Sequence, residues 1–123
     1  MKTLVVDDSV TMRKIPINIL ATAGYNDIVQ AGDGQQAVDG VMRQADIGLV
    51  LMDWNMPNML GIDALKLMRA AGKNIPVIVV TTEAEKSRVL DALKAGANNY
   101  IVKPFKPETI IGKIQETLVR TGG

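Results

Sequence analysis

Five short apolar runs, rich in β-branched residues, recur along the chain and predict buried β-strands. Most are apolar throughout rather than alternating, which is typical of strands that are covered on both faces. The runs occupy residues 4–6, 28–29, 49–52, 77–80 and 100–102. Their spacing leaves room for a helix after each strand.

The segments between and after these runs carry apolar residues at helical spacing. Ser9 is a suitable N-cap for the first helix, and Gly24 and Gly96 are suitable helix ends. The apolar stripes are Met12, Ile15, Ile19 and Ala23; Ala37, Val38, Val41 and Met42; Ile62, Leu65 and Met68; Val89, Leu90, Leu93 and Ala97; and Ile110, Ile114 and Leu118. The chain is therefore expected to alternate strand and helix five times.

This alternation predicts an α/β fold in which a doubly wound parallel sheet carries helices on both faces. The 123 residues suit one domain covering 1–123, without a linker, repeat or low-complexity tract. In such a sheet, ligands bind beyond the carboxyl ends of the strands, where the strand order reverses. Candidate chemistry is therefore expected at the strand ends.

Composition narrows the chemistry that those strand ends can carry. A hydrophobic fraction of 47% indicates a globular protein, and a net charge of +1 gives no nucleic-acid footprint. The absence of cysteine and histidine excludes disulfides, thiolate sites and imidazole sites. Reactions must therefore depend on carboxylates, hydroxyls, lysines and a hard cation.

The N-terminal sequence MKTLVVDDS does not resemble a secretory signal, because its apolar run is short and is followed by two acids. No run approaches the roughly 20 apolar residues that a membrane span requires. The chain is expected to be a soluble cytoplasmic protein with no membrane partner.

Charged and hydroxyl side chains follow four of the five strands. Asp7 and Asp8 follow the first, Asp53 the third, Thr81 the fourth and Lys103 the fifth. Three carboxylates at one edge repel each other and call for a cation. All-oxygen ligands favour Mg²⁺.

A hard cation, an ammonium and a hydroxyl around a free carboxylate can hold a phosphoryl group. An aspartate can also act as nucleophile and form an acyl phosphate. Taken singly, each residue has a structural explanation: an acid can cap a helix, Lys103 can be solvated, and Thr81 can be an ordinary strand residue. Their coincidence at one edge favours a phosphoryl site.

Four motifs resemble bacterial response-regulator receiver domains, and among them the single-domain chemotaxis (CheY-like) type. They are VVDDS with TMRKI, MDWNMPNM followed by Gly61, VVTTEAE, and KAGANNYIVKPF. They span nearly the whole chain in the family's order. The resemblance implies a flavodoxin-like fold with strand order 2-1-3-4-5 and five helices.

The resemblance assigns roles position by position. It implies that Asp53 is the phosphoacceptor, that Asp8 binds Mg²⁺ directly, and that Asp7 binds it through water. The backbone carbonyl of Asn55 matches a further metal ligand.

The resemblance also implies a switch. Thr81 and Lys103 match the groups that hold the phosphoryl oxygens, and Tyr100 matches an aromatic residue that turns inward as Thr81 moves. Lys103-Pro104 matches a cis peptide bond. Dephosphorylation is expected to depend on Asn55, Thr82 and Glu83.

A histidine kinase is the implied phosphodonor, and the output is implied to be contact with a partner protein, which in chemotaxis regulators is the flagellar motor switch. A phosphorelay intermediate or phosphate sink is an alternative with the same chemistry. Such a protein promotes only its own phosphotransfer and dephosphorylation and is not a conventional enzyme.

Two alternative functions belong to other classes of protein. A haloacid-dehalogenase-like phosphatase generally has a second acid two residues after the nucleophile, where this chain has Asn55. A flavodoxin-like flavin binder needs a phosphate-binding loop after the first strand, where Asp7 and Asp8 would repel a phosphate.

Two residues stand apart from these assignments. Pro16 falls inside the first predicted helix, where proline costs about 3 kcal/mol or more. A kink or an early break near Met12 to Ile15 is expected, with displacement of the helix by exchange between two chains as the alternative. Trp54 is expected to be partly buried against the following loop rather than to stack on a ligand.

Overall fold

The computed structural model describes residues 1–54, 56, 59–82 and 87–121. Five strands and five helices alternate along these ranges. In chain order they are β1 Lys2–Val6, α1 Val10–Thr22, β2 Ile28–Ala31, α2 Gly34–Arg43, β3 Ile47–Asp53, α3 Gly61–Ala70, β4 Val77–Thr82, α4 Val89–Lys94, β5 Asn99–Lys103 and α5 Pro107–Arg120.

The five strands form one sheet in the order β2-β1-β3-β4-β5, and every neighbouring pair is parallel. This confirms the predicted flavodoxin-like α/β fold. The order reverses beside β1, because β2 lies on one side of it and β3 on the other. The crevice for a ligand is therefore expected at the carboxyl ends of β1 and β3.

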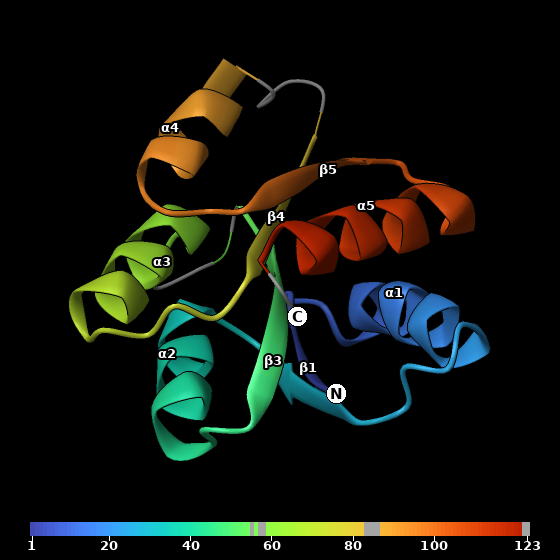
Figure 1. Ribbon diagram of the computed structural model, residues 1–123, viewed down its shortest axis with the longest axis horizontal. Coiled ribbons are helices and arrows are strands. Elements are labelled where there is room, and N and C mark those ends of the chain that lie inside the picture. The colour runs from blue at the N-terminus through green and yellow to red at the C-terminus, as the bar shows by residue number, and fades with distance from the viewer. Residues whose placement is uncertain (55, 57–58, 83–86, 122–123) are drawn as a thin grey trace.

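The sheet divides the apolar interior into two clusters. On one face, α1 and α5 cover residues such as Val5, Leu51 and Ile101. On the other, α2, α3 and α4 cover residues such as Val6 and Met52 (Figure 1). Alternate residues of each central strand thus point into different cores, which explains the uninterrupted apolar runs.

The predicted helix stripes are only partly correct. Ile62, Leu65 and Met68 on α3 and Ile110, Ile114 and Leu118 on α5 do pack against the cores. On α1 the prediction was partly wrong: Ile19 packs against a core, but Met12 and Ile15 are exposed, and Leu20 is the fully buried residue. Leu90 and Leu93 on α4 are likewise exposed, whereas Ala92 is buried, so small residues rather than large ones mark that contact face.

Helix α1 continues through Pro16, so the expected early break is wrong. Ser9 caps the helix as predicted, because its side chain accepts a hydrogen bond from the Met12 N–H at 3.2 Å. The bond that Pro16 cannot donate is the one to the Met12 carbonyl. The capped first turn and the packing of Leu20 hold the remaining turns in place.

The end of α4 is anchored by Arg69, which extends from α3. Its guanidinium donates to the Gly96 carbonyl at 2.8 and 3.2 Å, to the Lys73 carbonyl at 2.7 Å and to Asn98 Oδ1 at 3.1 Å. Burial lowers the pKa of Arg69 from its ordinary value. Gly96 has a φ of +113°, as expected for the glycine that ends this helix. None of the helices in the described ranges is long and apolar enough to cross a membrane.

Candidate functional site

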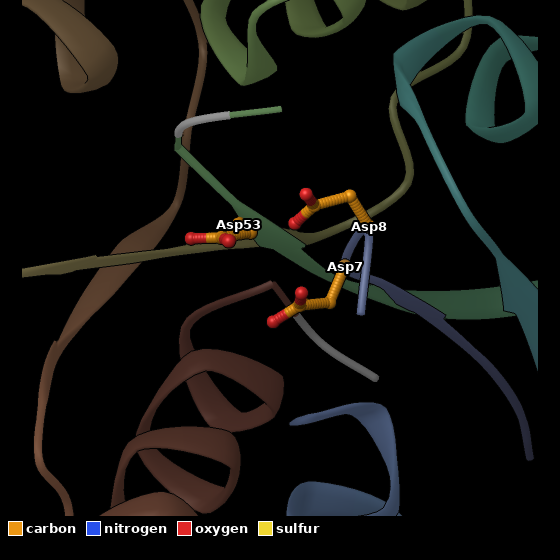
Figure 2. A group of neighbouring side chains, drawn as sticks. All are labelled: Asp7, Asp8 and Asp53. Atoms are coloured by element: carbon orange, nitrogen blue, oxygen red, sulfur yellow. The ribbon is translucent and has the colours of Figure 1, made fainter. Parts of the chain in front are cut away.

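Three carboxylates converge where β1 and β3 end. Figure 2 shows Asp7 and Asp8 after β1 and Asp53 at the end of β3, with their carboxyl groups directed to the same side. One oxygen from each lies within 4.8 Å of the others. Because both strands end beside the reversal of strand order, the fold itself brings the acids together.

Lys103 joins the acids from the end of β5. Its Nζ lies 3.3 Å from Asp53 Oδ1 and 3.5 Å from Asp7 Oδ2. The three side chains are largely buried, with 20% of Lys103, 13% of Asp53 and 11% of Asp7 exposed. An ammonium at this depth offsets part of the repulsion between the carboxylates.

The pKa of Asp53 reflects opposing influences of burial and neighbouring charges. Burial raises the pKa of Asp53 above its usual value, and the charge of Asp7 raises it further. Lys103 and the Trp54 N–H, which donates to Asp53 Oδ1 at 2.9 Å, oppose this shift. One lysine therefore does not compensate for burial and crowding of the acids.

Two contacts that the sequence pattern did not predict hold the loop that carries Asp7. The Ser9 N–H donates to Asp7 Oδ1 at 3.0 Å, and Arg13 Nη1 donates to the Asp7 carbonyl at 2.6 Å. Arg13 Nε also donates to Gln30 Oε1 at 3.0 Å. Arg13 follows Ser9 by one helical turn, so the N-cap signal was sufficient to place it near the site.

Close packing behind Asp53 depends on Gly61, the first residue of α3. A Cβ at this position would lie 2.5 Å from the Asp53 carbonyl oxygen, a distance that side chains do not tolerate. Trp54 follows Asp53 directly and is only 3% exposed, which is deeper than expected. Its Nε1–H has no hydrogen-bond partner among the described residues.

The strand register brings the remaining predicted residues of β4 and β5 to the same edge. Asp53 pairs with Val80, directly before Thr81, and Thr82 pairs with Lys103. Thr81 is buried, and its hydroxyl lies 3.4 Å from the Thr82 carbonyl. The Lys103–Pro104 peptide bond is cis, as expected.

Two predicted residues lie outside the described part of the chain. Asn55, expected to contribute a metal-binding carbonyl, and Glu83, expected to affect dephosphorylation, belong to residues whose structure is not described. The site as described thus consists of Asp7, Asp8 and Asp53 with Lys103, and Thr81 near it.

The residues present fit a hard divalent cation. Three carboxylates from two strand ends offer oxygen ligands within 4.8 Å of one another, and the Asp8 side chain is exposed to solvent. Mg²⁺ prefers oxygen ligands and usually keeps several waters, which an open site allows. A cation would also relieve the repulsion that Lys103 leaves uncompensated.

Comparison with known proteins identifies the family. The model of the response regulator receiver domain matches residues 3–115. The chain belongs to this receiver family. Receivers are phosphoacceptors of two-component signalling rather than conventional enzymes, and the acidic cluster is consistent with a receiver metal site.

Curated relatives of this receiver include chemotaxis proteins. It is 48% identical to the chemotaxis protein CheY1 of Helicobacter pylori over 120 residues, covering 96% of this chain and 97% of the relative. It is 43% identical to chemotaxis protein CheY-3 of Vibrio cholerae over 122 residues, covering 98% and 93%. Both alignments span nearly the full length of the relatives.

Solved structures agree with this relationship. The structure of chemotaxis response regulator CheY4 of Vibrio cholerae has a TM-score of 0.85 to this receiver at 33% identity. The match covers 95% of this chain and 98% of that chain. Fold and sequence thus point to the same family.

Proposed function

We propose that this receiver is a chemotaxis response regulator in which Asp53 accepts a phosphoryl group from a histidine kinase in the presence of Mg²⁺. The observation that carries the proposal is the convergence of Asp7, Asp8 and Asp53 within 4.8 Å, with Lys103 beside two of them. Relatives named as chemotaxis proteins support the pathway.

The phosphotransfer step uses the Asp53 carboxylate as nucleophile. A carboxylate oxygen attacks the phosphorus of a phosphohistidine, forming a P–O bond as the P–N bond breaks. The electron pair of the broken bond goes to the donor imidazole, which takes up a proton. Lys103, 3.3 Å from Asp53 Oδ1, is positioned to neutralise charge on the phosphoryl oxygens.

Asp8 and Asp53 would bind Mg²⁺ directly, with the Asn55 carbonyl as a further ligand and Asp7 acting through a water. The ion supplies neutralisation of negative charge on the transferring phosphoryl group. The Ser9 N–H and the Arg13 side chain hold Asp7 in place for this role.

Phosphorylation would be transmitted through Thr81 and Tyr100. Thr81 would turn to bind a phosphoryl oxygen, and Tyr100 would move into the space that Thr81 leaves. A phosphoryl group shifts the equilibrium between two conformations of the protein surface only as far as it interacts more favourably with one of them. The rate of dephosphorylation would depend on Asn55, Thr82 and Glu83.

The proposal implies protein partners on both sides of the reaction. A histidine kinase is the donor, and a protein of the flagellar motor switch is the output partner. Both interactions would take place in the cytoplasm, where ATP-dependent kinases act. Residues 1–123 would act as one receiver domain.

The central prediction concerns beryllofluoride, which imitates a phosphoryl group on aspartate. Adding it with Mg²⁺ should change the fluorescence of Trp54, the residue next to Asp53, and a chelator should abolish the response. Acetyl phosphate should add the mass of one phosphoryl group to the intact protein. Asp53→Asn should abolish both signals, because the nucleophilic oxygen is removed.

Two further variants make this experiment specific. Asp63→Asn, on the exposed surface of α3, removes one carboxylate elsewhere and should behave as the native protein. Asp8→Asn should shift the Mg²⁺ dependence to higher concentration. A response that persists in Asp53→Asn, or that does not require Mg²⁺, would contradict the proposal.

A further inference from the structure

A polar network ties α5 to the free edge of the sheet at β5. Asn99, only 5% exposed, donates from Nδ2 to Thr117 Oγ1 at 3.1 Å. The Thr117 hydroxyl donates to the Lys113 carbonyl at 2.7 Å. The Tyr100 N–H donates to Asn99 Oδ1 at 2.9 Å. The network fixes one turn of α5 against the strand that carries Tyr100.

Lys113 completes this network with its ammonium group. Its Nζ lies 4.3 Å from the centroid of the Tyr100 ring and 3.4 Å from Asn99 Oδ1. Within the described ranges no carboxylate forms an ion pair with Lys113. The charge is therefore directed at an aromatic face and an amide oxygen, a geometry in which the ring attracts a cation.

The contact links the two layers of the molecule around the sheet edge. β5 is the last strand in the sheet order. Tyr100 packs with the cluster on the α2, α3 and α4 side, whereas Ile110 and Ile114 of α5 belong to the opposite cluster. Lys113 extends from α5 to the Tyr100 ring, which packs with the cluster on the other side of the sheet. A change in the position of Tyr100 therefore alters a contact made by α5.

We propose that Lys113 is a positioning residue that holds Tyr100 in the arrangement seen here and opposes its inward movement. The inference rests on the proposed function, in which Tyr100 moves as Thr81 binds a phosphoryl oxygen. The Lys113 ammonium lies over the half-buried ring, and inward movement of the ring in the proposed switch would break this contact. In this arrangement the Thr81 hydroxyl lies 3.4 Å from the Thr82 carbonyl.

The direction of the effect follows from linkage between the contact and phosphorylation. A ligand binds with an apparent affinity reduced by the fraction of protein that occupies the competent state. Removing a contact that exists only in the non-competent state raises the fraction of protein in the competent state. The apparent affinity for a phosphoryl mimic should therefore rise when the Lys113 ammonium is removed.

The test compares two substitutions at one position. Lys113→Met keeps the length of the side chain without its charge, and Lys113→Arg keeps a cation that can lie over the ring. Titrating beryllofluoride in Mg²⁺ and following Trp54 fluorescence should give a midpoint about two- to five-fold lower for Lys113→Met, the factor equivalent to a partly exposed cation–π contact. Lys113→Arg should retain the native midpoint.

A spectroscopic readout separates positioning from general stability. The aromatic proton signals of Tyr100 should shift in Lys113→Met and much less in Lys113→Arg. In a Tyr100→Leu background, Lys113→Met should leave the midpoint unchanged, because the ring is absent. An unchanged or higher midpoint for Lys113→Met, or an equal decrease in the Tyr100→Leu background, would overturn the inference.

The outcomes distinguish this inference from the function on which it rests. If the native protein binds beryllofluoride in an Asp53-dependent way but Lys113→Met binds it equally well, the proposed function stands and the role of Lys113 fails. If the native protein gives no Asp53-dependent response, the proposed function fails, and the inference fails with it.

Discussion

At the scale of single residues, the fold places the Asp53 carboxyl where its ionised form is destabilised. Asp53 is surrounded by Asp7, Lys103 and the buried Trp54, and burial is the largest influence on its pKa, which it raises. The ionised carboxylate therefore costs folding free energy. A carboxylate whose charge is poorly compensated by its surroundings is stabilised most by a bound cation.

The raised pKa of Asp53 predicts a pH dependence of stability. Both folded and unfolded chains bind the Asp53 proton below the unfolded pKa of about 3.9. As pH rises through the higher pKa of the folded state, the unfolded chain releases this proton first and stability is lost. In a chelator, Asp53→Asn should therefore be more stable than the native protein at pH 7, with the difference vanishing near pH 4.

Chemical denaturation across this pH range measures the effect. Asp63→Asn, at an exposed position of α3, serves as the reference for loss of one carboxylate and should show no comparable increase with pH. A native protein as stable as Asp53→Asn at neutral pH would contradict the charge balance described above.

At the scale of elements, α1 contains the clearest local conflict. Pro16 removes one helical hydrogen bond, yet the helix is continuous from Val10–Thr22. Pro16 also lines a cavity of about 30 Å³, next to Met12 and Phe105. The helix therefore lacks one hydrogen bond at a position that borders a cavity.

Replacing this proline should stabilise the protein. Pro16→Ile restores the N–H for the Met12 carbonyl and adds apolar volume beside the cavity, and we expect a gain of about 2–3 kcal/mol in the free energy of unfolding. Thermal melting followed by circular dichroism measures it. Asn18→Ala, at an exposed position of the same helix, should change stability by less than about 0.5 kcal/mol. An unchanged melting temperature for Pro16→Ile would refute the strain argument.

The elements also show what the sequence could and could not predict. Strand positions were predictable because buried parallel strands are apolar throughout, and Asp53 and Lys103 were predictable because each directly follows such a run. The inward faces of α1 and α4 were not, since large apolar residues such as Met12 and Leu93 remain exposed while Leu20 and Ala92 make the contacts. Helical spacing of apolar residues predicts a helix, but tertiary packing decides which face of that helix lies against the core.

Contacts that depend on long-range geometry were also beyond the sequence. Nothing in the pattern indicated that Lys113 would lie over Tyr100. No role was predicted for Lys113, because its contact with Tyr100 depends on how α5 packs against β5. The N-cap at Ser9, by contrast, was readable because it is local.

At the scale of the whole molecule, the sheet separates two cores that should respond independently to mutation. Ile47 belongs to the cluster under α2, α3 and α4, and Ile114 to the cluster under α1 and α5. Each Ile→Val change should cost about 0.5–1.5 kcal/mol. The destabilisation of the double variant should equal the sum of the single ones within about 0.5 kcal/mol, since the two residues lie in different clusters.

Denaturant titration of the three variants tests this independence. Ile47→Val with Val41→Ala, both within one cluster, is the comparison pair and should deviate more from additivity. Strong coupling between Ile47 and Ile114 would show that the sheet transmits packing changes between its faces.

The contacts of Arg69 have a consequence for how α4 can respond. The guanidinium holds the Gly96 carbonyl beyond one end of this short helix and reaches Asn98 before β5. That end is thereby fixed to α3. A displacement of α4 is therefore expected to be a rotation about Gly96, largest at the end of the helix that begins with Val89.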